Sequence, residues 1–172
     1  MKQKRTWKKV LAAAVIAAII LIALLPFPQK INTTLYGVQG IVGDAASAAS
    51  CTIEIKGTCY RYLLKPDTYF GRLAISTIPD TMSENVQLQS SNIGSLSALT
   101  YHTEDGYKSL GIFFASSSFD QLLIHINESQ GGGEVFATGQ TFVLAPADSY
   151  QDAKDMVSEL AQMNEAIITA AW

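Results

Sequence analysis

Two residues of this 172-residue sequence could act together in metal binding or acid–base chemistry. His102 and Glu104 are two positions apart, so a β-strand would place the imidazole and the carboxylate on the same outer face. Such a pair could form half of a metal site or an acid–base pair. A catalytic zinc site needs three protein ligands, and this pair lacks the third. We therefore predict no catalytic residue, no metal site and no cofactor, and we keep His102 and Glu104 as the pair that an enzyme would use.

The two cysteines, Cys51 and Cys59, could form a disulfide or supply a nucleophile. Lys56-Gly57 resembles a two-residue turn with Gly at a positive φ, which predicts that residues 51–55 and 58–64 form a hairpin. In that register the cysteines are out of step and on opposite faces, so we expect no bridge. A bridge is favoured instead if Cys51 belongs to a flexible segment. The hairpin predicts an inner face made of Cys51, Ile53, Ile55, Tyr60, Tyr62 and Leu64.

A nucleophilic cysteine needs a nearby base, and the histidines of this chain are His102 and His125. His125 alternates with Leu123 inside an apolar strand, so we interpret it as a partly buried structural histidine. Ser116-Ser117-Ser118 and Gly131-Gly132-Gly133 match no nucleophile elbow, P-loop or dinucleotide fingerprint. The sequence thus offers no recognisable catalytic constellation.

Strand-like alternation dominates residues 51–145, and the chain ends in a helical pattern. Residues 69–78 and 121–126 are predicted strands, and Asp105-Gly106 predicts a hairpin that pairs Tyr101 with Leu110. We expect another hairpin between 134–138 and 141–144, and a long loop over 80–95. Ser149 and Asp152 resemble a capping box and begin an amphipathic helix over about 149–171 with an apolar stripe. The predicted fold is α+β and mainly β: an antiparallel β-sandwich-like sheet domain with a C-terminal helix.

The N-terminus predicts where the protein resides. Residues 1–9 contain five basic side chains, and Val10–Phe27 follows without a charge. As a helix this run is about 27 Å long, close to the hydrocarbon thickness of a bilayer. A cleaved secretory signal is the alternative, but the small-residue site Ala46-Ser47-Ala48 comes too late. We predict a cytoplasmic tail at 1–9, a single-pass transmembrane signal anchor at 10–28, a flexible stalk at 29–50 and an extracytoplasmic domain at 51–172.

Charge counting separates the two parts of the chain. All 15 acidic residues but only seven of the 12 basic residues follow the anchor, so that part carries a net charge of −8. Such a domain repels nucleic acid and anionic headgroups, which excludes a nucleic-acid partner. The expected function is a membrane-anchored, non-catalytic binding or accessory module of the cell envelope, with the membrane and an envelope or cell-wall protein as partners. The alternative is a cell-surface hydrolase or metal-dependent enzyme that uses His102 and Glu104.

Overall fold

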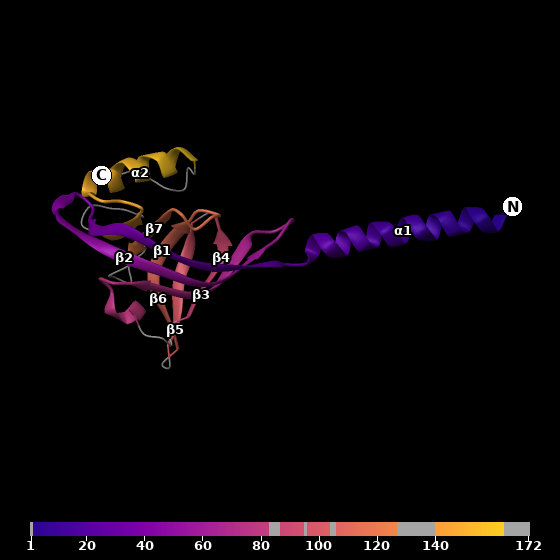
Figure 1. Ribbon diagram of the computed structural model, residues 1–172, viewed down its shortest axis with the longest axis horizontal. Helices are drawn as coiled ribbons and strands as arrows, with labels where there is room; N and C mark the ends of the chain where they lie inside the picture. Colours follow the sequence, from indigo (N-terminus) through magenta and orange to yellow (C-terminus); the bar gives the residue numbers. More distant parts are fainter. Residues whose placement is uncertain (1, 83–86, 95, 104–105, 127–139, 164–172) are drawn as a thin grey trace.

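A computed structural model describes residues 2–82, 87–94, 96–103, 106–126 and 140–163 of the chain. In these residues eight antiparallel strands follow one another around a closed barrel, and the first strand pairs with the last. One helix leads into the barrel from the N-terminus and projects away from it, and a second helix lies on its outer surface (Figure 1). The chain is therefore mainly β, with a C-terminal helix as predicted.

The helices and strands have the following bounds. The N-terminal helix α1 spans Lys2–Leu24, the short 3-10 helix η1 spans Pro79–Met82 and the C-terminal helix α2 spans Tyr150–Met163. The strands are β1 (Phe27–Ile41), β2 (Asp44–Arg61), β3 (Asp67–Ile75), β4 (Gln87–Ile93), β5 (Ser97–Thr103), β6 (Gly106–Ala115), β7 (Leu122–Ile126) and β8 (Thr141–Ala145).

The predicted β-sandwich is wrong, because a single sheet curls and closes on itself. Closure occurs where residues 38–41 of β1 pair with residues 141–144 of β8. All eight strands then send alternate side chains into one interior, which is typical of a closed sheet. The interior contains Ile31, Cys51, Ile53, Ile55, Cys59, Tyr69, Leu73, Ile75, Ile93, Leu99, Leu110, Phe113, Ala115, Leu122, Ile124, Val143 and Ala145.

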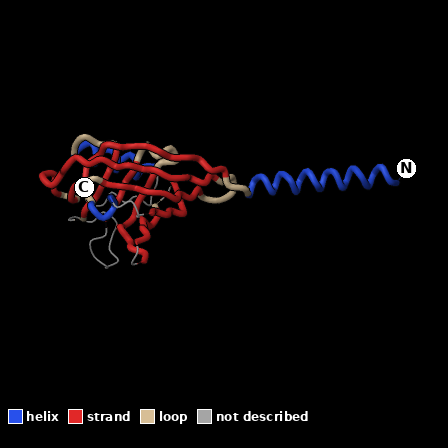
Figure 2. The backbone as a smooth tube through the Cα atoms, turned by 60° about the horizontal axis from the view of Figure 1, so that its bottom comes forward, coloured by secondary structure: helices blue, strands red, loops and turns tan. Residues whose placement is uncertain are grey.

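The predicted stalk at 29–50 is also wrong. These residues form β1 and the first part of β2, which pair along almost their whole length from Phe27 with Arg61 to Ile41 with Asp44 (Figure 2). The long ladder satisfies their backbone groups, and Ile31, Val38 and Val42 are buried in the two cores. The folded domain therefore begins at residue 27 and not at residue 51.

The predicted hairpin at Lys56-Gly57 does not exist, because β2 continues straight through both residues. Gly57 pairs with Ile31 on one side and with Gly71 on the other. Without a turn the strand does not exchange its faces, so Cys59 is buried inside rather than exposed. Leu64, predicted to be inside, is 71% exposed.

Other predicted strands agree more closely with the structure. The Asp105-Gly106 region does join two paired strands, β5 and β6, but Tyr101 pairs with Lys108 and not with Leu110. The predicted strand at 69–78 is confirmed over residues 69–75 as part of β3, which ends at Ile75, and the predicted strand at 121–126 is confirmed as β7, which begins at Leu122. The predicted loop over 80–95 contains η1 and the strand β4. Residues 134–138 of the other predicted hairpin lie outside the described residues.

Helix α2 covers the outer surface of the barrel where β1, β6, β7 and β8 meet. Ser149 begins the helix, since its Oγ accepts a hydrogen bond from the backbone N of Asp152 at 3.1 Å. The Asp152 carboxylate accepts one from the backbone N of Asp148 at 3.3 Å, one residue earlier than a capping box requires. The buried helix residues are Ala153, Met156, Val157 and Leu160, which contact Val38, Val42, Phe114, Leu123, Phe142 and Leu144. The predicted covering helix is confirmed up to residue 163.

Helix α1 exposes large apolar side chains, among them Trp7, Val10 and Ile16. Within the described part of the chain, no helix is long and apolar enough to cross a membrane. The transmembrane anchor at 10–28 therefore stays a prediction from the sequence.

Candidate functional site

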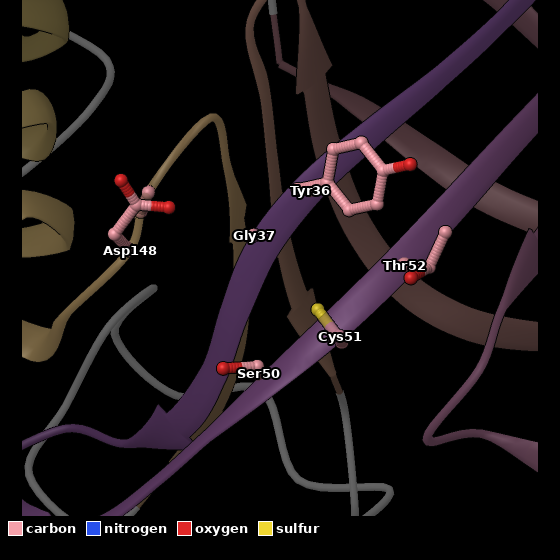
Figure 3. A pocket seen from close by; sticks show the side chains of 7 residues that line it. Tyr36, Gly37, Ser50, Cys51, Thr52 and Asp148 are labelled. Atoms are coloured by element: carbon pink, nitrogen blue, oxygen red, sulfur yellow. The ribbon is translucent and has the colours of Figure 1, made fainter.

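A pocket of about 290 Å³ opens between the β1–β2 hairpin and the segment that leads into α2. Tyr36 and Gly37 of β1 form one part of its wall, and Ala147 and Asp148 form the part next to α2 (Figure 3). Ser50, Cys51 and Thr52 of β2 complete the lining. The backbone N of Ala147 donates a hydrogen bond to the carbonyl oxygen of Tyr36 at 3.3 Å, which fixes the two walls relative to each other.

Gly37 lies at the edge of the pocket and allows β8 to approach β1 closely. Gly37 pairs with Cys51 across the β1–β2 ladder, and the Cys51 thiol lines the pocket beside it. A Cβ at Gly37 would lie 2.2 Å from the carbonyl oxygen of Leu144, so no other residue fits here without moving β8. The sequence shows a glycine at 37, but only the barrel closure reveals why it is needed.

The Cys51 thiol is not prepared for nucleophilic chemistry. Its side chain is 4% exposed, and burial raises the pKa of the Cys51 thiol to about 11. The thiolate is the nucleophile and the metal ligand, so at neutral pH this group is a small apolar side chain with a weak donor. The pocket can offer hydroxyl groups and the Asp148 carboxylate to a small polar molecule, and its lining includes no histidine.

The structure does not bring the predicted site residues to this pocket. His102 lies in β5, four strands away from β1 around the barrel, and pairs with Tyr107 and Gln87. Glu104 lies outside the described residues. Across the described part of the chain, no cluster of three or more His, Cys, Asp or Glu side chains could hold a metal ion.

His125 is buried on β7, as its place in an apolar strand predicts. Burial lowers the pKa of His125, and a hydrogen bond with the side chain of Gln140 acts in the opposite direction. Its strand neighbours are Ile112 and Phe142. His125 is therefore a buried structural residue of β7, and it does not line the pocket.

Three comparisons, with protein-family models, with curated proteins and with solved structures, found no match to this chain.

Proposed function

We propose that this protein is a membrane-anchored extracytoplasmic module that binds or assists another component of the cell envelope. The single membrane span lies within residues 10–28, in the part that α1 forms up to Leu24, because Phe27 and Pro28 belong to β1. Residues 1–9 remain in the cytoplasm and the barrel lies outside. The proposal rests on the uncharged run of residues 10–27 and on the basic residues before it, which favour a cytoplasmic N-terminus.

One structural observation carries the proposal: β1 begins at Phe27, within the last residues of the apolar run. Strand β1 pairs with both β2 and β8, so it is needed to close the barrel. A secretory cleavage near Ala46-Ser47-Ala48 would remove this strand and open the sheet. The folded domain is therefore compatible with an N-terminal helix that stays attached.

The surface of α1 supports the same proposal. Its exposed large apolar side chains are Trp7, Val10, Leu11, Val15, Ile16, Ile20 and Leu24, and at 100° per residue they lie on all sides of the helix. Helices that are apolar all round are found inside large cores or in membranes. Figures 1 and 2 show α1 projecting from the barrel without packing on it, so the barrel does not supply that core.

The test compares wild type with Ile16→Arg in cells that express the full chain. An arginine at the centre of a span costs about 2.5–3.5 kcal/mol, so the variant should lose its resistance to carbonate extraction. Ala45→Arg places the same charge at an exposed position in β2 and should behave as wild type. Protease added outside should digest the barrel and spare an N-terminal tag. A mature N-terminus between residues 29 and 51, or wild type released by carbonate, would overturn the proposal.

The enzyme alternative predicts a different result for His102 and Glu104. If the protein is a non-catalytic module, the His102→Ala, Glu104→Ala double variant should melt within a few degrees of the parent. Neither protein should change its melting temperature on addition of zinc or a chelator. A chelator that lowers the melting temperature of the parent alone would instead favour a metal-dependent enzyme.

A further inference from the structure

The connection between β2 and β3 lies at the end of the barrel from which α1 departs. Phe27, the first residue of β1, pairs with Arg61, the last residue of β2, so residues 62–66 begin beside the end of the helix. Figures 1 and 2 both show this loop next to the junction of α1 and β1. Leu25 and Pro26 are the two residues between α1 and Phe27, which limits the separation of helix and barrel to about 10 Å.

This loop exposes apolar side chains to water. Leu63 is 65% exposed, Leu64 is 71% exposed and Phe27 beside them is 48% exposed. We call Phe27, Leu63, Leu64 and Lys65 the anchor-proximal tip. The packed interior of the barrel takes up none of these four side chains. A cluster of exposed apolar residues at one place usually marks an interaction site.

The loop is held in a fixed shape that points its leucines outward. Arg61 and Asp67, at its two ends, form an ion pair at 2.6 Å, and both side chains are less than one quarter exposed. The other Asp67 oxygen accepts a hydrogen bond from the backbone N of Tyr62 at 3.0 Å. The Lys65 ammonium lies 3.8 Å from the centre of the Tyr62 ring. These contacts hold the two ends of the loop together. Leu63 and Leu64 lie between those ends and form its tip.

The net charge of −8 predicts that the domain as a whole is repelled from anionic lipids. The basic and acidic residues are, however, unevenly distributed between β1–β3 and the rest of the domain. Residues 27–75, which include β1 to β3, contain five basic and three acidic side chains, a net charge of +2. Residues 76–172 contain two basic and 12 acidic side chains, a net charge of −10. Lys30, Arg61 and Lys65 belong to the anchor end, together with Asp67 and with Asp120 of the loop whose Ser117 carbonyl accepts a hydrogen bond from Arg61. These five side chains sum to +1, so this end is attracted to an anionic surface, whereas the domain as a whole carries −8.

We propose that the anchor-proximal tip docks into the anionic outer surface of the membrane that holds the anchor. Leu63 and Leu64 enter the interfacial layer, and Lys30 and Lys65 lie among the headgroups, as amphipathic interfacial segments do. This inference rests on the proposed membrane anchor. The short tether makes docking effectively intramolecular, so a contact area too small to bind a membrane by itself is sufficient. The docked tip fixes the orientation of the barrel, with α2 and the pocket facing away from the bilayer.

The test places the full chain in lipid nanodiscs and reports the surroundings of residue 64. Leu64→Cys carries an environment-sensitive fluorophore, and Cys51 and Cys59 are buried and do not compete for the label. In discs of phosphatidylcholine with phosphatidylglycerol, the emission should shift to shorter wavelength and be quenched by spin-labelled headgroups. Ala46→Cys, exposed at the other end of the hairpin about 45 Å away along β1, should remain water-like.

Charge variants test the lipid chemistry. In the labelled protein, Lys65→Gln should reduce the ratio of docked to undocked tip about fivefold, and Lys30→Gln by a similar factor. Lys154→Gln on α2 removes the same charge far from the tip and should have no effect. Leu63→Ser, with the label at 64, should reduce the ratio at least tenfold.

The failures of the two proposals can be told apart. A chain that carbonate extracts from cells overturns the anchor and the tip together. A chain that stays in the disc with a water-like signal at residue 64 overturns the tip alone. An equal signal in discs with and without phosphatidylglycerol overturns docking to an anionic surface.

Discussion

Gly57 of β2 lies directly opposite Gly71 of β3, and the Tyr69 hydroxyl occupies the space beside both. A Cβ at Gly57 would lie 2.5 Å from the carbonyl oxygen of Phe70, and one at Gly71 would lie 2.4 Å from that of Lys56. The Tyr69 hydroxyl donates a hydrogen bond to the carbonyl oxygen of Arg72 at 2.9 Å, so it is held in this place. The two glycines thus allow a tyrosine to cross the inner surface of the sheet.

We predict that Gly57→Ala destabilises the barrel by about 1–3 kcal/mol, because the new methyl group overlaps backbone atoms that belong to the ladder. Urea unfolding followed by circular dichroism measures the loss. Thr58→Ala is the control, because Thr58 is the next residue along β2 and its side chain points to the other face of the sheet. This variant should change the free energy of unfolding by no more than about 0.5 kcal/mol. Equal stabilities of wild type and Gly57→Ala would show that the two strands are further apart than the structure has them.

Gly57 also explains the main error of the sequence prediction. Lys56-Gly57 between two alternating segments resembles a turn, because a turn is the usual local reason for a glycine. Here the reason is close contact with β3, and the glycines with positive φ among the described residues are Gly43, Gly94 and Gly111. A contact with a strand fourteen residues later leaves no local signal. The wrong turn then reversed the expected faces of residues 58–64.

The strands that sequence reasoning found are those with strong apolar alternation or apolar runs. Residues 122–125 are buried on both faces, and Tyr69, Leu73 and Ile75 of β3 alternate into the core, so the composition of these strands reveals them. Residues 29–34 are mostly polar and residues 43–50 are mostly small, and their strand structure depends on the β1–β2 ladder and on the pairing of β1 with β8. Context of this kind overrides β-propensity. The pocket beside Gly37 depends on the same closure, so no local pattern could indicate it.

Cys51 should make the stability of the domain depend on alkaline pH. Its pKa is raised to about 11 by burial, from an ordinary value of 9.0. Between these values the unfolded chain has lost the thiol proton and the folded chain still holds it, so stability falls as pH rises from 9 to 11. Two pKa units correspond to at most about 2–3 kcal/mol. Denaturant unfolding at several pH values should show a shallower decline for Cys51→Ala than for wild type or for Ser50→Ala.

Cys51 and Cys59 should remain free thiols in the folded protein under oxidising conditions. They lie eight residues apart in the same strand, about 26 Å from each other, whereas bridged Cα atoms lie within about 7 Å. Both thiols are free in the structure. Mass mapping of a non-reduced digest after treatment with an oxidant should detect both cysteine peptides unlinked. A linked pair would require β2 to be broken between the two residues.

Ser149 should contribute measurably to the docking of α2. Its hydroxyl accepts a hydrogen bond from one of the free backbone N–H groups at the start of the helix, so Ser149→Ala should cost about 1 kcal/mol. Ser158→Ala makes the same change in the middle of α2, where alanine has the higher helix propensity, and should leave stability unchanged or slightly higher. Thermal unfolding of the two variants in parallel distinguishes the cap from a general effect of removing a hydroxyl.

Arg61 should contribute far more to the stability of the barrel than Lys56, the other basic residue that forms an ion pair among the described residues. Arg61 forms an ion pair with Asp67, and its guanidinium donates hydrogen bonds to the side-chain oxygen of Gln29 at 3.1 Å and to the carbonyl oxygen of Ser117. Arg61→Met leaves the partly buried Asp67 carboxylate without its cationic donor, which should cost about 1–3 kcal/mol.

Lys56→Met is the matched control, because Lys56 and Glu54 form an ion pair whose side chains are 55% and 46% exposed. Such surface pairs contribute about 0–1 kcal/mol, so this variant should unfold close to wild type. The stability of Arg61→Lys should lie between those of Arg61→Met and Lys56→Met, because one ammonium group cannot make all the hydrogen bonds of a guanidinium that contacts three partners. Urea midpoints for the three variants measure this order. An Arg61→Met protein as stable as Lys56→Met would mean that water, and not Arg61, satisfies these groups at the base of the β2–β3 loop.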